Sequence, residues 1–212
     1  MCGITGIFNY HKTPVSRDVL TKMTRIIKHR GPDDEGLWTD GFIGLGHRRL
    51  AILDLTSAAH QPMVSNDGRY VITYNGEIYN FKSLKTELER KGYQFHSSSD
   101  TEVLLNAWSC WGTESLLKFN GMFAFAIWDR RKNSLVLARD RYGIKPLYYW
   151  DNGGRLVFGS EIKSILQHPG YRLDVSHEAL NEYFTFQNVF SDRTLFEGIR
   201  MVPSGTFMEY WL

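Results

Sequence analysis

The stretch from Met122 to Phe158 constrains the fold more than any other part of this sequence. It contains four short segments rich in aliphatic and aromatic residues, "MFAFAIWD", "SLVLARD", "PLYYWD" and "RLVFGS". The turn-forming segments "RRKN", "RYGIK" and "DNGG" separate them. Strand-length apolar segments joined by short turns are typical of antiparallel sheets. The sequence therefore predicts a meandering antiparallel sheet over these residues.

Further strands are predicted at residues 3–10 and within "FIGLGHRRLAILDL" and "RYVITYNGEIYN". Between the strands, apolar residues that recur on one helical face predict helices. The predicted helices run from Ser16 to Gly31, from Asn80 to Gly92, from Asp100 to Gly112, from Ser160 to Gln167 and from Ser176 to Gln187. Because helices arrive in pairs between runs of strands, we expect an α+β fold with helices packed on sheet faces.

Length and composition favour one domain. The chain has 212 residues, 42% of them hydrophobic and 23% charged, which is enough to bury a sizeable core. No internal repeat, low-complexity segment or linker divides the sequence, so a single domain is expected over residues 1–212. The sequence stops within the strand-like segment "VPSGTFMEYWL", and we expect it to be a fragment of a longer protein.

Charge and cysteine content argue against several classes of function. The 25 basic and 23 acidic residues are spread along the chain, without the basic stripe that nucleic-acid or membrane binding requires. Cys2 and Cys110 are too few for a disulfide framework and indicate a reducing cytoplasm. There is no signal peptide and no apolar run near the roughly 20 residues of a membrane span. Metal-ligand spacings and nucleotide-binding fingerprints are missing too, so small polar partners fit best.

Cys2 follows the initiator methionine directly. Removal of Met1 would give Cys2 a free α-amine, whose ordinary pKa of about 7.7 to 8.0 lies close to neutrality. Such an amine can accept the thiol proton, so one residue would supply both nucleophile and base. The simpler interpretation is a small apolar residue at the start of a strand. The choice between them depends on the residues that accompany Cys2.

Three residues suit a substrate that carries both an amide and an α-amino group. Asn75 and Gly76, in "YNGEIYN", predict either a hairpin turn or a pair of neutral donors that form an oxyanion hole. Asp100, in "SSSDTE", is either the N-cap of the third helix or a carboxylate that binds an α-ammonium group. Both alternatives stay open for each.

Two of three further arginines also raise alternatives. Arg48 and Arg49 lie in a strand-like run that should be buried, where an unpaired guanidinium is costly. They would form a structural salt bridge or bind the α-carboxylate of a substrate. Arg30, in "KHRGPDDEG", is interpreted as part of a helix stop and polar turn.

Eight motifs in order resemble a known family: "MCGITGIF", "HRGPDDEG", "GHRRLAILDL", "YNGEIYN", "SSSDTEVLL", "GMFAFAIWD", "RDRYGIKPLYY" and "FGSEIKSI". Together they resemble the N-terminal glutaminase domain of glutamine-hydrolysing asparagine synthetases. These are class II glutamine amidotransferases within the N-terminal-nucleophile hydrolase group. The resemblance covers residues 2–205 and implies a four-layer α/β/β/α sandwich, with two antiparallel sheets flanked by helices.

The resemblance also assigns roles to six residues. It implies hydrolysis of the side-chain amide of L-glutamine through a thioester on the N-terminal cysteine. The residues are Cys2 as nucleophile, Asn75 and Gly76 as the oxyanion hole, and Arg49, Glu77 and Asp100 as contacts to glutamine.

Members of this family continue into an ATP-dependent synthetase domain with an "SGGLDSS"-type loop, which this sequence does not contain. We therefore expect no metal and no cofactor in this domain, with ATP and magnesium bound only by the missing synthetase domain. That domain would receive the ammonia and amidate aspartate, and a homodimer is compatible with the resemblance. Two alternatives stay open: a non-catalytic glutamine-sensing module, and the glutaminase half of a different amide-forming synthetase.

Overall fold

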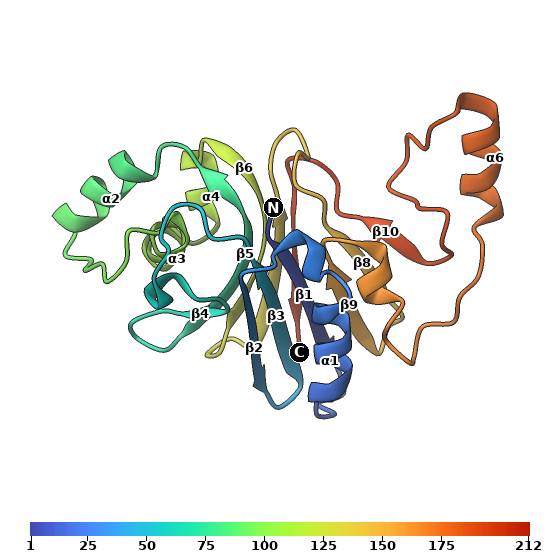
Figure 1. The fold of residues 1–212 in the computed structure, drawn as a ribbon, viewed down its shortest axis with the longest axis horizontal. Coiled ribbons are helices and arrows are strands. Elements are labelled where there is room, and N and C mark those ends of the chain that lie inside the picture. The colour runs from blue at the N-terminus through green and yellow to red at the C-terminus, as the bar shows by residue number, and fades with distance from the viewer.

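The computed structural model describes residues 1–212, which form two antiparallel sheets lying face to face (Figure 1). In spatial order, the first sheet contains β10 (Ile199–Met201), β8 (Tyr148–Asp151), β9 (Arg155–Gly159), β1 (Gly3–Asn9), β3 (Ile43–Arg49) and β2 (Asp34–Asp40). The second contains β11 (Phe207–Trp211), β7 (Ser134–Arg139), β6 (Gly121–Asp129), β5 (Tyr70–Ile78) and β4 (Met63–Val64).

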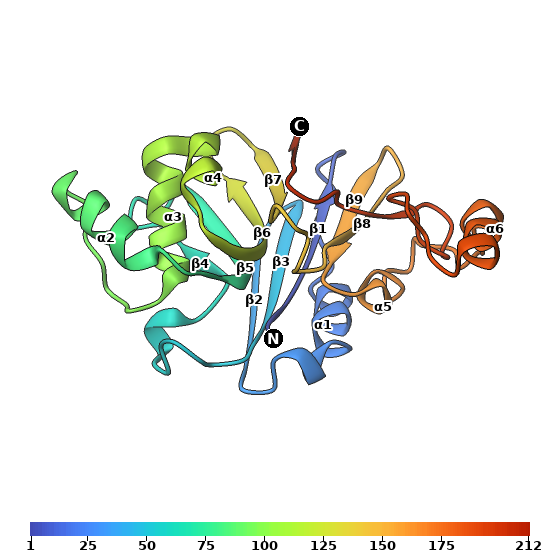
Figure 2. The same ribbon diagram turned by 90° about the horizontal axis from the view of Figure 1, so that it is seen from above.

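Helices cover the outer face of each sheet (Figures 1 and 2). The second sheet is covered by α2 (Phe81–Arg90), α3 (Asp100–Trp111) and α4 (Ser115–Lys118), and the first by α1 (Arg17–Arg25) and α5 (Ile162–Ile165). A further helix, α6 (His177–Phe186), lies at the far edge of the first sheet, away from the sandwich. The arrangement confirms the predicted α+β fold and the four-layer α/β/β/α sandwich. None of the helices is long and apolar enough to cross a membrane.

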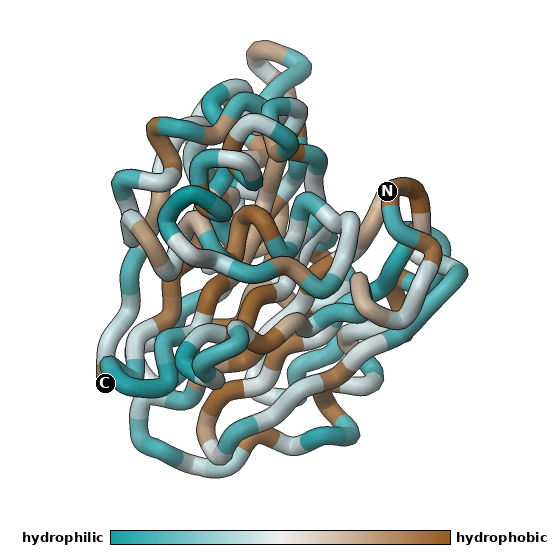
Figure 3. Tube along the Cα trace, turned by 90° about the vertical axis from the view of Figure 1, so that its left-hand side faces the viewer, coloured by the Kyte–Doolittle hydropathy of each residue, from teal (hydrophilic) through white to brown (hydrophobic).

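Three separate apolar cores fill the spaces between the four layers. The residues of β6 contribute to two of these cores, because successive side chains of a strand point to opposite faces of the sheet. Phe125 and Ile127 pack with α2 and α3, whereas Ala124 and Ala126 belong to the core between the sheets. A third core joins the first sheet to α1 and α5. Figure 3 shows the hydrophobic segments concentrated in the central strands. Both sheets are therefore buried on both faces.

The prediction of one meandering sheet from Met122 to Phe158 is wrong in its topology. β6 and β7 pair in the second sheet, whereas β8 and β9 pair in the first. The segment at residues 140–147 carries the chain from one sheet to the other. Turn spacing predicts the hairpins correctly, but it holds no information about which sheet each hairpin joins.

Several predicted element boundaries also need correction. The first helix ends at Arg25, and residues Lys28–Arg30 form a separate 3-10 turn. The helix predicted from Ser160 to Gln167 is shortened to α5. The strand predicted through "LAILDL" ends at Arg49, because the following apolar side chains do not enter a core. Instead, Ile52 is 72% exposed and lies on a loop at the rim of a pocket.

Candidate active site

A pocket of about 210 Å³ lies where the first turn of α3 and the ends of β1, β3 and β5 meet. The antiparallel register pairs Gly3 of β1 with Arg48 of β3, which places the residue before β1 beside the end of β3. All six residues to which the resemblance assigns roles line this pocket: Cys2, Arg49, Asn75, Gly76, Glu77 and Asp100. Residues distant in sequence are thus gathered at one place by strand pairing and sheet packing.

The Cys2 thiol is held against the backbone just beyond β3. Its Sγ lies 3.4 Å from the backbone nitrogen of Leu50, which donates to it, and 3.7 Å from the Leu50 carbonyl oxygen. Burial raises the pKa of the Cys2 thiol, although the hydrogen bond from Leu50 and the nearby N-terminal charge oppose this. The thiol is therefore protonated at neutral pH and needs a base before it can act as a nucleophile.

The backbone of Cys2 is held by Arg30. Its Nε donates to the Cys2 carbonyl oxygen at 2.9 Å, and its guanidinium also pairs with Glu161 at 3.1 Å. Arg30 does lie in a turn after the first helix, as expected, but its side chain also links Cys2 to Glu161. Its side chain is only 9% exposed. No local pattern could reveal this role, because the contact joins residues on different elements.

The two adjacent arginines at the end of β3 have different environments. Arg48 forms an ion pair with Glu35 at 2.8 Å and donates to the Gly31 carbonyl oxygen, so it is the structural salt bridge. Arg49 is also buried, but its guanidinium donates only to the carbonyl oxygens of Asp54 and Thr56. No carboxylate pairs with Arg49. A buried cation without a counterion thus lines the pocket.

Asp100 is the corresponding buried anion, and the prediction that it caps the helix is wrong. Ser99 is the N-cap, because its Oγ accepts from the backbone nitrogen of Thr101. The Asp100 carboxylate accepts instead from the Tyr74 hydroxyl at 2.7 Å and the Ile78 backbone nitrogen at 3.0 Å. It has no ion pair, and burial raises its pKa despite these hydrogen bonds. The residue is only 5% exposed.

Asn75 and Gly76 lie within β5, opposite Ala124 and Phe123 of β6, so the hairpin-turn alternative is wrong. The Asn75 side-chain nitrogen is buried without a hydrogen-bond partner, which is unusual for a buried donor. A side chain at Gly76 would collide with the Met122 carbonyl oxygen, so packing against β6 already requires glycine there. The neighbouring Glu77 is half-buried at the pocket wall.

The structure adds pocket residues that the sequence did not single out. Gln61 accepts from the Tyr74 backbone nitrogen at 2.7 Å and donates to the Thr101 hydroxyl at 3.1 Å, which links β5 to α3 behind the pocket. Lys145 reaches the pocket from the segment between β7 and β8. Polar residues such as Gln61 and Lys145 do not contribute to the hydrophobic pattern, so neither could be selected from residue spacing alone.

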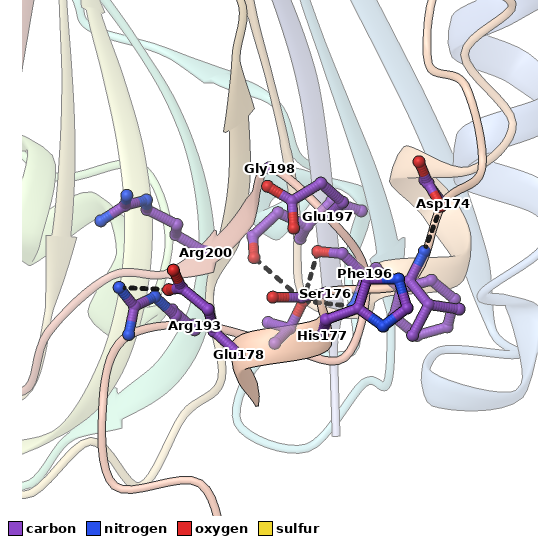
Figure 4. Close-up of a pocket in the computed structure, with 12 residues that line it drawn as sticks. Asp174, Ser176, His177, Glu178, Arg193, Phe196, Glu197, Gly198 and Arg200 are labelled. Carbon is purple, nitrogen blue, oxygen red and sulfur yellow. Dashed lines mark hydrogen bonds and ion pairs between the residues drawn. The ribbon is translucent and has the colours of Figure 1, made fainter. Parts of the chain in front are cut away.

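A second pocket, of about 400 Å³, lies at the start of α6 (Figure 4). Both of its arginines are paired with carboxylates. Arg193 pairs with Glu178 at 2.7 Å, and Arg200 pairs with Asp192 at 3.1 Å. It contains no thiol and no buried polar group that lacks a partner. No part of the structure gathers three or more side chains suited to holding a metal ion.

Comparison with known proteins agrees with this geometry. Residues 1–212 match the model of a family described as the glutamine amidotransferase domain. The chain belongs to this family. It is 43% identical to asparagine synthetase (glutamine-hydrolysing) 3 of Bacillus subtilis over 87% of this chain and 30% of that protein. It is 41% identical to asparagine synthetase 1 of the same organism over 97% of this chain and 33% of that protein. The resemblance found in the sequence is confirmed.

Solved structures support the same fold. A glutamine phosphoribosylpyrophosphate amidotransferase from B. subtilis aligns with a TM-score of 0.66 at 24% identity, over 77% of this chain and 43% of that one. A structure described as the allosteric regulatory enzyme of purine biosynthesis aligns with a TM-score of 0.67 at 22% identity, over 95% of this chain and 48% of that one. The chain is thus an enzymatic glutamine amidotransferase domain, and it spans about a third of the length of the two asparagine synthetases.

Proposed function

We propose that this domain hydrolyses the side-chain amide of L-glutamine to glutamate and ammonia at the pocket that contains Cys2. The observation that carries the proposal is the pair of buried charges beside the thiol. Arg49 and Asp100 both lack an ionic partner, and burial of an unpaired charge is costly. An amino acid zwitterion compensates both, since its carboxylate can bind Arg49 and its ammonium can bind Asp100. Its side chain is then directed to Cys2.

In this proposal the reaction requires removal of Met1. The α-amine of Cys2 takes the thiol proton, and Sγ attacks the amide carbon of glutamine. The tetrahedral intermediate collapses when the C–N bond breaks, and the protonated amine returns its proton to the leaving ammonia. Water then attacks the glutamyl thioester, which releases glutamate and restores the thiol. Retained Met1 would leave an amide nitrogen at Cys2, which cannot serve as a base.

The oxyanion of the tetrahedral intermediate would be stabilised by Asn75 and Gly76. The free side-chain nitrogen of Asn75 is a donor that needs no rearrangement before it binds a developing charge. Donors that are already oriented are the most effective, and loss of one such donor costs about 10² to 10³ in kcat. Glu77, on the same strand, is proposed as a further contact to glutamine.

Glutamate release by the Met1-free domain tests the proposal, with intact mass spectrometry to establish that Met1 is absent. Cys2→Ala is expected to abolish release, because no other thiol lines the pocket. Cys110→Ala is the matched control and should retain activity, since Cys110 packs against the core beneath α3. Undiminished release by Cys2→Ala would overturn the mechanism. Glutamine binding without glutamate formation would favour a glutamine-sensing module instead.

For the longer protein, we propose ATP-dependent amidation of aspartate, supported by the names of its relatives. This domain would pass ammonia to a C-terminal synthetase domain, which would hold the ATP and magnesium. The glutaminase half would then need no metal or cofactor of its own. We further propose a cytoplasmic protein without nucleic-acid or membrane partners, in which residues 1–212 act as one domain and a homodimer is an accessible assembly. Asparagine formation by the full-length protein, measured with glutamine as nitrogen donor, tests the acceptor.

A further inference from the structure

Lys145 is a buried cation whose presence in the pocket the mechanism above does not explain. The residue is 5% exposed and forms no ion pair, and its Nζ lies 3.3 Å from the Sδ of Met1. It lines the same pocket as Cys2. A buried ammonium group without a counterion is costly, so its position calls for an explanation beyond packing.

The surrounding structure holds Lys145 in place. The fully buried carboxylate of Asp140 accepts from the backbone nitrogens of Phe123, Ile144 and Lys145 at 3.0 to 3.2 Å. Arg139 donates to the Lys145 carbonyl oxygen at 2.9 Å. These contacts fix residues 140–145 to the second sheet. The Asp140 carboxylate is occupied by these backbone donors, so it does not neutralise the lysine directly.

We propose that Lys145 keeps the α-amine of Cys2 in its unprotonated, basic form once Met1 has been removed. The inference rests on the proposed function, in which this amine is the base. Met1, Cys2 and Lys145 line the same pocket, and the Lys145 Nζ contacts the Met1 side chain, so removal of Met1 creates the new amine in the pocket that contains this ammonium group. A neighbouring positive charge disfavours a second one, so the ammonium form of the amine is destabilised. Lys145 is thus a positioning residue that acts through Cys2.

Lys145 lies close enough to Cys2 for the charges of the two residues to interact. Burial and the nearby Arg30 lower the pKa of Lys145, whereas Cys2, Asp140 and Glu77 act in the opposite direction. Arg30 also reaches residue 2 itself, because its Nε donates to the Cys2 carbonyl oxygen.

The other charged groups around the site are Arg49 at the end of β3, Asp100 on α3 and Glu161, which pairs with Arg30. In the proposed complex, Arg49 and Asp100 bind the substrate zwitterion. Because Arg30 is paired with Glu161, Lys145 then remains as the pocket cation without a counterion.

The pH profile of kcat/KM tests the role of Lys145. Lys145→Met keeps the length and removes the charge, so the acidic limb, which reports the base of the free enzyme, should move to higher pH. If the acidic limb moves up by one pH unit, kcat/KM should fall about tenfold at pH 6.5 and recover near pH 9. Lys145→Arg should retain the original limb, and Lys132→Met, an exposed lysine remote from the pocket, should change nothing. An equal loss at every pH would overturn the proposal.

A second measurement does not need glutaminase activity, so it separates this proposal from the proposed function. In a Cys2→Ser background without Met1, the rate at which acetic anhydride acetylates the N-terminal amine is followed against pH by peptide mass spectrometry. Addition of Lys145→Met, or of Lys145→Gln if the former does not fold, should move the titration of the amine to higher pH. An unchanged titration would overturn the role of Lys145. Retained activity in Cys2→Ala would overturn only the proposed function.

Discussion

Two neighbouring arginines at the end of β3 differ in whether they have a counterion, and this difference separates a structural residue from a candidate ligand. Arg48 has Glu35 as its counterion and Arg49 has none, although both side chains are buried. Strand alternation explains the difference, because consecutive residues of a strand point to opposite faces of the sheet. On one face Arg48 lies directly across from Glu35 of the neighbouring strand β2, whereas Arg49 lines the pocket. The same local sequence thus provides a structural residue and a candidate substrate ligand.

Replacement of each arginine by methionine should separate these roles. Arg49→Met is expected to raise the KM for glutamine about 10- to 100-fold with a smaller change in kcat, because a charge-assisted contact to the bound α-carboxylate is lost. Arg48→Met should leave KM close to that of the wild type. It should instead lower the free energy of unfolding by about 2 kcal/mol, since the Gly31 carbonyl oxygen loses its donor and Glu35 keeps only the exposed Arg25 as a partner. Steady-state kinetics and urea unfolding measure both, and an equal rise of KM in both variants would contradict the assignment.

Only part of the site could be predicted from the residues themselves. An N-terminal cysteine, an Asn-Gly pair and a buried arginine each carry chemistry that is visible in the sequence. For Asp100 the residues alone left an N-cap and a substrate contact open, because "SSSD" offers several equivalent caps, and only the resemblance assigned it to the site; Ser99 provides the cap. Lys145 and Gln61 could not be selected at all. They reach the pocket through contacts between elements, about which local periodicity contains no information.

At the scale of elements, the rim of the pocket depends on the loop that follows β3. The Asp54 carboxylate accepts from the Thr56 backbone nitrogen at 2.8 Å and its hydroxyl at 2.6 Å, and from the Ser98 backbone nitrogen at 2.9 Å. The carbonyl oxygens of Asp54 and Thr56 in turn bind Arg49. The Asp54 carboxylate therefore stabilises the loop internally through Thr56 and connects it to Ser98, just before α3. We expect the position of Arg49 to depend on it.

Asp54→Asn should destabilise the domain at pH 7 by about 1 to 2 kcal/mol, because an amide cannot accept all of these bonds. The hydrogen bonds from Thr56 and Ser98 hold the pKa of Asp54 below its ordinary value. Its contribution to stability is therefore complete above the unfolded pKa of about 3.9 and is lost as pH falls through the folded pKa. Urea unfolding at pH 7, 5 and 3 should show a difference between wild type and variant that is constant at first and shrinks at pH 3.

The matched control for the loop is Asp67→Asn. Asp67 accepts from the Ser65 hydroxyl at 2.6 Å in a turn remote from the pocket, and its pKa is lowered in the same way. Asp54→Asn should also raise the KM for glutamine several-fold, whereas Asp67→Asn should not. A stability difference that grows on acidification, or a KM effect shared by both variants, would contradict this account of the loop.

At the scale of the whole molecule, the site is assembled from both sheets. Cys2 directly precedes β1 and Arg49 ends β3 in the first sheet, whereas Asn75 and Gly76 belong to β5 of the second. The core between the sheets therefore sets the separation of the proposed nucleophile from the proposed oxyanion donors. Ala126 of β6 belongs to this inner core, whereas Ala138 of β7 belongs to the core beneath the helices. Both side chains are fully buried, on opposite faces of one sheet.

Enlargement of these two alanines should distinguish stability from site geometry. Ala126→Leu and Ala138→Leu each overpack a core and should lower the free energy of unfolding by about 1 to 3 kcal/mol. Only Ala126→Leu pushes the two sheets apart, so it alone should reduce kcat for glutamate release, by about 100-fold for a displacement near 1 Å. Ala138→Leu displaces helices that carry no reacting atom and should retain kcat. Urea unfolding and steady-state kinetics, both at 25 °C, measure the two effects. An equal loss of kcat in both variants would show that stability, rather than the spacing of the sheets, limits the reaction.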